Sequence, residues 1–402
     1  MSLSDTPAAP DPSAASVPGA APESPTAALA EPTQKVTARW VTGLVLVNVG
    51  INAAFFGPIN VFIGQQAIGI DEANKEAILS LVTGCGAAVS LVANPLFGAL
   101  SDRTVSGFGR RAPWVLAGAI LATAALLAMS GATAVALMVL FWCLVQLGAN
   151  AAYAAITAAV PDRVPVLQRG GVGGLAAMGQ TVGILLGAVF GAVVSGNFMV
   201  GYTMCAAALL FSVLPYLFHR NDPPLPRELR PPFTWGSFLR GFWISPARHP
   251  DFAWAWLTRF LVNVCNQMTI VYLLFFLRDV LKHEDPALGV LTLTGIYAVM
   301  VMITAVIAGP WSDRLGRRKP FVIGSSAIIA AAGLTMAFFP VWTGALIGAG
   351  ILGVGFGAYL AVDFALLTQV LPRAADRARI WESSTWPTRC LRCSRPSSHS
   401  CP

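Results

Sequence analysis

Charged side chains are scarce in this sequence. Asp, Glu, Lys and Arg make up 11% of its 402 residues, whereas hydrophobic residues make up 55%. A soluble protein of this length needs far more charge to cover its surface. The composition therefore excludes an ordinary soluble protein and favours one that lies in a lipid bilayer.

Histidine is rare, and the cysteines form no paired framework. The four histidines all lie outside the long apolar runs, at His219, His249, His283 and His399. No Ser–His–Asp arrangement and no cluster of metal ligands stands out, so the sequence predicts no enzyme, no metal site and no cofactor. Cys390 and Cys393 have the spacing of a zinc-binding pair, but no second pair accompanies them.

The sequence instead contains a series of long apolar runs, each close to the ~20 residues that a helix needs to cross a bilayer. Gly and Ala abound in them, as is typical of membrane helices that pack closely. This pattern predicts an all-α polytopic membrane protein. The ten expected spans are residues 41–66, 77–100, 114–132, 135–159, 171–195, 198–218, 252–277, 287–309, 321–340 and 343–370.

The spans and the segments between them divide the chain into five parts. Residues 1–38 are rich in Ala, Pro and Ser and lack the pattern of a signal peptide, so we expect a disordered cytosolic arm. Residues 39–218 hold six spans, 219–250 form a polar cytosolic linker, and 251–379 hold four spans. From residue 380 to residue 402 the composition changes abruptly, and we expect an aberrant tail.

Basic residues are distributed unevenly among the loops. With the N-terminus inside the cell, the inside segments up to Arg379 hold 19 Lys and Arg residues, and the outside segments hold only Lys75, Arg278 and Lys282. Such a bias sets the orientation of membrane proteins. It accounts for the net charge of +7 better than nucleic-acid binding does, because the basic residues are scattered through short loops. We therefore predict a multi-pass protein of the cell membrane, with a cytosolic N-terminus and no nucleic-acid partner.

A charged motif occurs twice, at matching places in the two halves of the chain. Each copy places a Gly, an Asp-Arg pair and a Gly-Arg-Arg cluster between two apolar runs, which indicates an internal repeat. A plain basic loop that only sets the topology is the alternative interpretation. The residues of the two copies are Gly98, Asp102, Arg103, Gly109, Arg110 and Arg111, and Gly309, Asp313, Arg314, Gly316, Arg317 and Arg318.

The pattern resembles the signature loop of the major facilitator superfamily, Gly-x-x-x-Asp-Arg-x-Gly-Arg-Arg. The first copy has four extra residues between Arg103 and Gly109 and ends in Arg-Arg-x-Pro. In this it is similar to the sucrose-transporter and glycoside–cation symporter branch. The resemblance covers roughly residues 40–379 and implies two pseudo-symmetric bundles that rock around a central cavity. It implies twelve helices, of which ten are present. It also implies that the loops are gating latches, the first docking near the eleventh helix and the second near the fifth.

Two ionisable residues lie inside the spans. Arg259 is about seven residues from the cytosolic start of the span 252–277, and Asp363 is about seven from the cytosolic end of the span 343–370. At 1.5 Å per residue, both lie roughly 10 Å deep. Charges at such depths pair or face a cavity. Two interpretations of these residues therefore remain. They form either a permanent structural ion pair or a pair that depends on a proton or on the solute.

Uncharged polar residues form helical stripes in four spans, the first, fourth, seventh and tenth, which line the cavity in the superfamily. Amides and tyrosines both donate and accept hydrogen bonds, as the hydroxyls of a neutral sugar require. Hydrogen bonding between helices explains any one of these residues equally well. The candidate cavity residues are Asn48, Asn52, Gln146, Asn150, Tyr153, Asn263, Asn266, Gln267 and Tyr359.

The tail from Ile380 onward suggests a separate hypothesis. Its Ser, Trp and Cys codons mostly begin with T, and a one-base shift moves that T to the middle position, which encodes apolar residues. With permitted codons, the shifted reading of residues 380–392 becomes Asp-Leu-Gly-Val-Ile-Asn-Val-Ala-Asn-Ala-Leu-Pro-Gln. We therefore expect that a one-base deletion near codon 380 has truncated the family sequence. A natural hydrophilic tail is the alternative.

Together these features predict a secondary active transporter, expected to be a monomer, that carries a small neutral solute such as a sugar or glycoside together with a proton. A drug or metabolite exporter of the same superfamily is the alternative within that class. The amides disfavour it, because drug pockets tend to be apolar. A truncated remnant that transports nothing is the alternative from a different class.

Overall fold

The computed structural model describes residues 32–194, 196–218, 235–236, 250–315 and 319–370. All regular elements in these ranges are helices, and ten helical stretches are long and apolar enough to cross a membrane, which confirms the predicted fold class. The elements are α1 (Ala38–Gly57), η2 (Pro58–Phe62), α2 (Ile63–Ile70), α3 (Lys75–Ser101), α4 (Ala112–Ser130), α5 (Val135–Arg163), α6 (Val166–Val193), α7 (Phe198–Phe218), α9 (Pro250–Phe275), η4 (Phe276–Val280), α10 (Pro286–Leu315), α11 (Lys319–Phe338) and α12 (Trp342–Val370).

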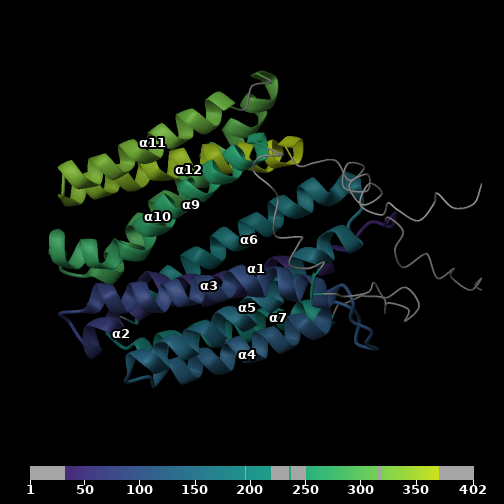
Figure 1. Ribbon diagram of the computed structural model, residues 1–402, viewed down its shortest axis with the longest axis horizontal. Helices are drawn as coiled ribbons and strands as arrows, with labels where there is room; N and C mark the ends of the chain where they lie inside the picture. Colours follow the sequence, from purple (N-terminus) through teal and green to yellow (C-terminus); the bar gives the residue numbers. More distant parts are fainter. Residues whose placement is uncertain (1–31, 195, 219–234, 237–249, 316–318, 371–402) are drawn as a thin grey trace, which may run out of the picture.

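The helices pack in two groups, as Figure 1 shows. In the first, α1 packs against α6 and α7, and α5 packs against α3 and α4. In the second, α12 packs against α9, α10 and α11. Helix α6 also contacts α10, so it lies where the two groups meet. We call them the N-terminal group (α1–α7) and the C-terminal group (α9–α12).

The first span is longer and less regular than expected. Instead of one helix over residues 41–66, the chain runs from Ala38 to Ile70 as α1, η2 and α2. Pro58 lacks a backbone N–H and disturbs the α-helical ladder around it. The turn that it begins is π-helical, and the Ile63 N–H bonds the Pro58 carbonyl at its end. Such π turns are frequent at functional sites.

Glycines bring α6 against α1. A Cβ on Gly183 would lie 2.4 Å from the Val49 carbonyl oxygen, and one on Gly187 would lie 2.6 Å from the Gly57 nitrogen. No larger side chain fits at such distances without moving a backbone. The expected close packing of Gly-rich helices is therefore confirmed at these positions.

Several predictions from the sequence fall outside the described residues. They concern the N-terminal arm up to residue 31, most of the linker, the tail from residue 371 onward and the loop residues Gly316, Arg317 and Arg318. The segment boundaries and the frameshift therefore stay predictions.

Candidate functional site

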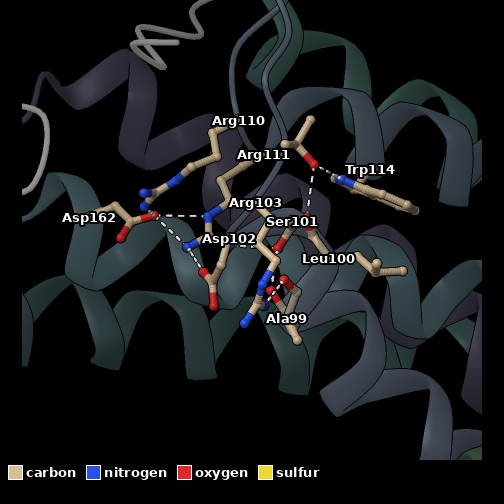
Figure 2. A network of polar contacts seen from close by, with 11 residues as sticks. Ala99, Leu100, Ser101, Asp102, Arg103, Arg110, Arg111, Trp114 and Asp162 are labelled. Carbon is tan, nitrogen blue, oxygen red and sulfur yellow. Dashed lines mark hydrogen bonds and ion pairs between the residues drawn. The ribbon is translucent and has the colours of Figure 1, made fainter. Parts of the chain in front are cut away.

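The first charged motif is a network centred on Arg111, whose residue is only 3% exposed. Its guanidinium reaches Asp102 at 2.5 Å, Asp162 at 2.8 Å and the Ser101 hydroxyl at 2.5 Å. Arg110 pairs with the same Asp162 carboxylate (Figure 2). Charge-assisted hydrogen bonds of this kind are roughly twice as strong as neutral ones. The network therefore fastens the α3–α4 loop to the end of α5.

The backbone of the loop explains its sequence. Gly109 has a φ of 98°, in the left-handed region that other residues rarely adopt, so glycine is required there. The extra residues of this copy also have a contact, because the Trp114 Nε1 donates to the Thr104 hydroxyl at 2.6 Å. Gly98 has open space around its Cα, so no close packing accounts for it. Arg103 donates to the Ala99 carbonyl oxygen one turn before it.

The second copy of the motif can be placed only in part. Gly309, Asp313 and Arg314 lie in the last turns of α10, and the rest of the copy lies outside the described residues. The docking that the resemblance implies for the two loops stays a prediction.

At the opposite end of the helices, ionic side chains join the two groups. We call this the hairpin end (residues 71–76 and 278–285) and the other the motif end (residues 101–112 and 162–169). Lys75 pairs with Asp279 at 2.7 Å and lies over the Phe275 ring, and Arg278 pairs with Glu72 at 2.6 Å. The hydroxyl groups of Ser80 and Tyr272 also share a hydrogen bond. These contacts close the hairpin end.

The turn before α3 is ordered by Asp71. Its carboxylate accepts hydrogen bonds from the backbone of Ala73 and from the side chain and backbone of Asn74. The bond from the Asn74 side chain is the main reason why the pKa of Asp71 is lowered. This turn positions Glu72 and Lys75 toward the C-terminal group.

A cavity of about 330 Å³ lies between the two groups. Phe56 of α1 and Gln180, Thr181 and Ile184 of α6 contribute to its wall from the N-terminal group. The rest of the wall comes from α9, α10, α11 and α12. None of the described lining residues carries a charge. The lining from the C-terminal group is Asn263, Asn266, Gln267, Thr269, Ile270, Leu273, Leu293, Thr294, Tyr297, Ala298, Val301, Met336, Ala349, Leu352, Phe356 and Leu360.

Three of the predicted cavity residues, Asn263, Asn266 and Gln267, lie on this wall. The other six do not, and most of them serve helix packing instead. Asn48 and Asn52 donate to the carbonyls one turn before them, at 2.9 and 2.8 Å, and their Cβ atoms lie beside the α6 glycines. Their contact with a solute stays a prediction.

Gln146 and Asn150 face α3 rather than the cavity. The Ser90 hydroxyl donates to Gln146 Oε1 at 2.7 Å and accepts from Asn150 Nδ2 at 2.9 Å. These two contacts are hydrogen bonds between helices, which is the alternative interpretation given for the polar stripes. Tyr153 packs against the core of the N-terminal group, and Tyr359 is 2% exposed in a small cluster with Val262.

The candidate charge pair lies on neighbouring helices. Arg259 is in α9, Asp363 is in α12, and these two helices pack against each other. The Arg259 carbonyl accepts a hydrogen bond from Asn263 at 2.8 Å. The Asp363 side chain lies outside the described part of the chain, so the ion pair stays a prediction.

Sequence reasoning missed three residues of these sites. Asp162 is the shared carboxylate of the motif network, Gln180 lines the cavity from α6, and Tyr297 lines it from α10. Tyr297 and Gln180 are polar side chains inside apolar runs, a signal that the sequence does contain. Asp162 lies just after an apolar run, but nothing in the sequence identifies its partner 51 positions away.

Two helix groups that share a cavity near the middle of the membrane are typical of secondary transporters. A sequence profile of the Major Facilitator Superfamily matches residues 39–380. The chain belongs to that superfamily. Membership in a family of transporters is what supports the prediction of a non-enzymatic protein. No curated protein matches the chain in sequence.

Solved transporters share the fold at low sequence identity. A bacterial homologue of the human lysosomal transporter Spinster, inward-facing and occupied, is 16% identical, with a TM-score of 0.64 over 85% of this chain and 76% of its own. A peptide transporter, POT, in complex with sulfate is 15% identical, with a TM-score of 0.65 over 88% and 87%. A POT family transporter with a thioalcohol-conjugated peptide is 12% identical, with a TM-score of 0.64 over 85% and 86%. Identities this low indicate a common fold and say nothing about the solute.

Proposed function

We propose that the chain is a proton-coupled symporter that carries a neutral sugar or glycoside by alternating access. The observation that carries this proposal is the uncharged polar wall of the cavity, where Asn263, Asn266 and Gln267 meet Gln180 and Thr181 across the two groups. Amides and hydroxyls match the mixed donors and acceptors of a sugar. A carboxylate or ammonium solute finds no opposite charge among the described lining residues.

Uptake into proteoliposomes tests the proposal. The purified protein is given sucrose, maltose and methyl β-D-glucoside, with and without an imposed inward proton gradient. We expect the gradient to accelerate uptake of at least one of them. Asn263→Ala should lower this uptake about tenfold, because it removes a polar group from the cavity. Asn197→Ala is the control, since Asn197 is not part of the cavity lining and its side chain accepts a hydrogen bond from the Val200 N–H at the start of α7. Equal uptake by protein and empty liposomes would contradict the proposal.

The exporter alternative is favoured by a different part of the same wall. Phe56, Met336, Leu352 and Phe356 give the cavity a large apolar surface, as drug pockets have. A fluorescent apolar cation separates the two functions. Proton-driven extrusion of the dye, with no uptake of sugar, supports the exporter. A folded protein that moves neither solute supports the non-transporting alternative.

We also propose that Arg259 and Asp363 couple transport to the proton. They lie on two packed helices, and a buried carboxylate beside a guanidinium changes its partner when it is protonated. Asp363→Asn should abolish acceleration by the proton gradient but retain sugar counterflow. Removing one partner leaves a lone buried charge, so Asp363→Asn with Arg259→Gln should express better than either single variant. A double variant no better than the singles would argue against the pair.

The proposed orientation places the hairpin end outside the cell membrane, and the N-terminus and the motif end in the cytosol. It follows from the uneven distribution of Lys and Arg among the loops. Single cysteines at Ala73, an exposed residue of the same loop as Lys75, and at Arg240 test it with an impermeant maleimide added outside intact cells. Labelling at 73 and not at 240 is expected, and the reverse would overturn the topology. We further propose that the transporter is monomeric, which light scattering of the purified protein in detergent checks.

A further inference from the structure

Two amides of α9 that line the cavity are each held by a partner. The Asn263 Nδ2 donates to the Arg259 carbonyl oxygen at 2.8 Å, one turn earlier in the same helix. The Asn266 Oδ1 accepts from the Tyr297 hydroxyl of α10 at 3.2 Å. Within the described part of the chain, no hydrogen bond engages the other amide atoms, Asn263 Oδ1 and Asn266 Nδ2.

The two unengaged atoms differ in kind. Asn263 has a carbonyl oxygen left, which only accepts, and Asn266 has an N–H group left, which only donates. Positions three apart are neighbours on one helix face, with Cβ atoms about 5–6 Å from each other. Both residues line the cavity. The α9 wall therefore offers one acceptor beside one donor.

The orientation of Asn266 depends on Tyr297, and α12 in turn holds Tyr297 in place. A Cβ on Gly353 would lie 2.6 Å from the Tyr297 carbonyl oxygen, so α12 and α10 touch backbone to backbone there. The ring of Tyr297 is also 6.2 Å from the ring of Phe356. The phenol that gives its proton to Asn266 Oδ1 favours this amide orientation. A reversed amide could only donate to the phenol oxygen, and it would leave the hydroxyl proton without an acceptor among the described residues.

We propose that Tyr297 is a positioning residue that keeps the Asn266 N–H group facing the cavity, so that the α9 wall selects a solute with a hydrogen-bond acceptor next to a donor. This inference rests on the proposed function and adds the rule by which the solute is chosen. Two adjacent hydroxyls satisfy the rule, because one accepts from Asn266 while the other donates to Asn263. A carboxylate only accepts and an ammonium only donates, so each leaves one of the two amides unpaired at a cost in binding.

Replacing Tyr297 by Phe keeps the ring and removes only the hydroxyl. Tyr202→Phe is the matched control, since Tyr202 donates to the Gln66 side-chain carbonyl at 3.0 Å in the N-terminal group, away from the cavity. Gln66 keeps its own bonds to Met129 and Ala132 in that variant. Both variants lose one tyrosine–amide hydrogen bond, which is part-buried for Tyr297 and buried for Tyr202, so a general loss of stability would appear in both.

The first measurement is made without solute, on protein labelled with ¹⁵N-asparagine in detergent micelles. The side-chain amide signals of Asn266 are identified by their loss in Asn266→Ala. In Tyr297→Phe we expect these signals to shift and broaden, because the amide turns over. In Tyr202→Phe they should stay in place. Unchanged Asn266 signals in Tyr297→Phe would overturn the proposal, whatever the protein transports.

The second measurement is competition in proteoliposomes, with the transported sugar of the panel as the probe. Each monodeoxy derivative loses both the donor and the acceptor of one hydroxyl, whereas each mono-O-methyl derivative loses only the donor. The wild type should bind the sugar about tenfold more tightly than the monodeoxy derivative that lacks the hydroxyl accepting from Asn266, as expected for one hydrogen bond in a buried site. Tyr297→Phe should raise KM three- to tenfold, with kcat within twofold, and reduce this discrimination to threefold or less.

The outcomes separate the inference from the proposed function. Sugar uptake with full discrimination in Tyr297→Phe would refute the positioning role and leave the symporter intact. If the protein transports no sugar of the panel, the proposed function fails, and the amide signals still decide whether Tyr297 orients Asn266. Equal losses in Tyr297→Phe and Tyr202→Phe would mean that Tyr297 only stabilises the fold.

Discussion

Contacts within the N-terminal group and contacts between the two groups are built from different interactions. Within the group, α6 meets α1 backbone to backbone, and the Arg111 network is largely buried. Between the groups at the hairpin end, apolar contacts such as Gly64 with Leu274 are accompanied by ion pairs such as Arg278 with Glu72, whose side chains are 34% and 66% exposed. Exposed pairs contribute little because water competes for them. The buried ionic network therefore strengthens the N-terminal group, whereas the exposed ion pairs add little to the contact between the groups.

The motif loop illustrates the same difference. In this conformation its described ion pairs all lie within the N-terminal group, from α3 and α4 to the end of α5. These pairs hold the loop against α5 as an internal brace. Its role as a latch between the groups stays a prediction.

The largest expected effect is that of Arg111→Ala, which removes the centre of the brace. It leaves the carboxylates of Asp102 and Asp162 without their shared guanidinium. Breaking a buried ionic network from one side costs about 3 kcal/mol of unfolding free energy. A thermal melt in detergent should show a clear fall in the unfolding temperature.

Arg110→Ala is the control for that variant. Arg110 pairs with Asp162 alone among the described residues, and its side chain is 13% exposed, so its loss should cost less. Equal destabilisation by the two variants would mean that total charge, and not the buried centre, stabilises the loop.

A smaller effect is expected from Gly183→Ala, which tests the α1–α6 contact. The new Cβ would lie 2.4 Å from the Val49 carbonyl oxygen, so one of the two helices has to move. Overpacking of this kind costs about 2 kcal/mol. Gly174→Ala in the same helix is the matched control, because that position has no neighbour within 4 Å. Gly174→Ala should melt no lower than the wild type, since Ala favours helix. A wild-type melt for Gly183→Ala would refute close packing there.

The sequence predicts the local properties of this protein well. Apolar length decides whether a helix spans the bilayer, and the ten spans were therefore predictable. A left-handed turn at Gly109 is also a local requirement. Polar stripes are local too, but a stripe shows only that residues share a helix face. It does not tell which neighbour that face meets, so Gln146 and Asn150 were expected at the cavity and lie against Ser90.

The missed residues all depend on tertiary packing. Asp162 becomes a partner of Arg110 and Arg111 only because α4 and α5 are packed side by side. Tyr297 orients Asn266 only because α10 lies beside α9.

The contacts between the groups should show a smaller effect in a double-mutant cycle of Lys75 and Asp279. Their side chains are 11% and 36% exposed, so we expect a coupling of up to about 1 kcal/mol. Such a coupling shifts the balance between closed and open hairpin ends about fivefold.

A cysteine in place of Thr294 on the cavity wall reports the shift through its labelling rate with an impermeant maleimide added from the hairpin end. Exchanging the two charges, Lys75→Asp with Asp279→Lys, should restore slow labelling. Fast labelling in the exchanged variant would show that the ion pair does not close this end.

The smallest effect should come from Ser80→Ala. Its hydroxyl bonds the Tyr272 hydroxyl across the two groups, and it also bonds the Glu76 carbonyl within α3. Ser80 is exposed, so water replaces the lost bond, and we expect a cost of about 0.5 kcal/mol. That corresponds to roughly a twofold rise in the labelling rate of the same cavity cysteine.

Thr83→Val is the matched control one turn further along, because the Thr83 hydroxyl bonds only carbonyls of α3 in the described structure. If the bond between the groups is responsible, Tyr272→Phe should match Ser80→Ala, and combining the two should add nothing further. Additive effects would mean that each hydroxyl acts within its own helix and that the bond between the two groups is not responsible.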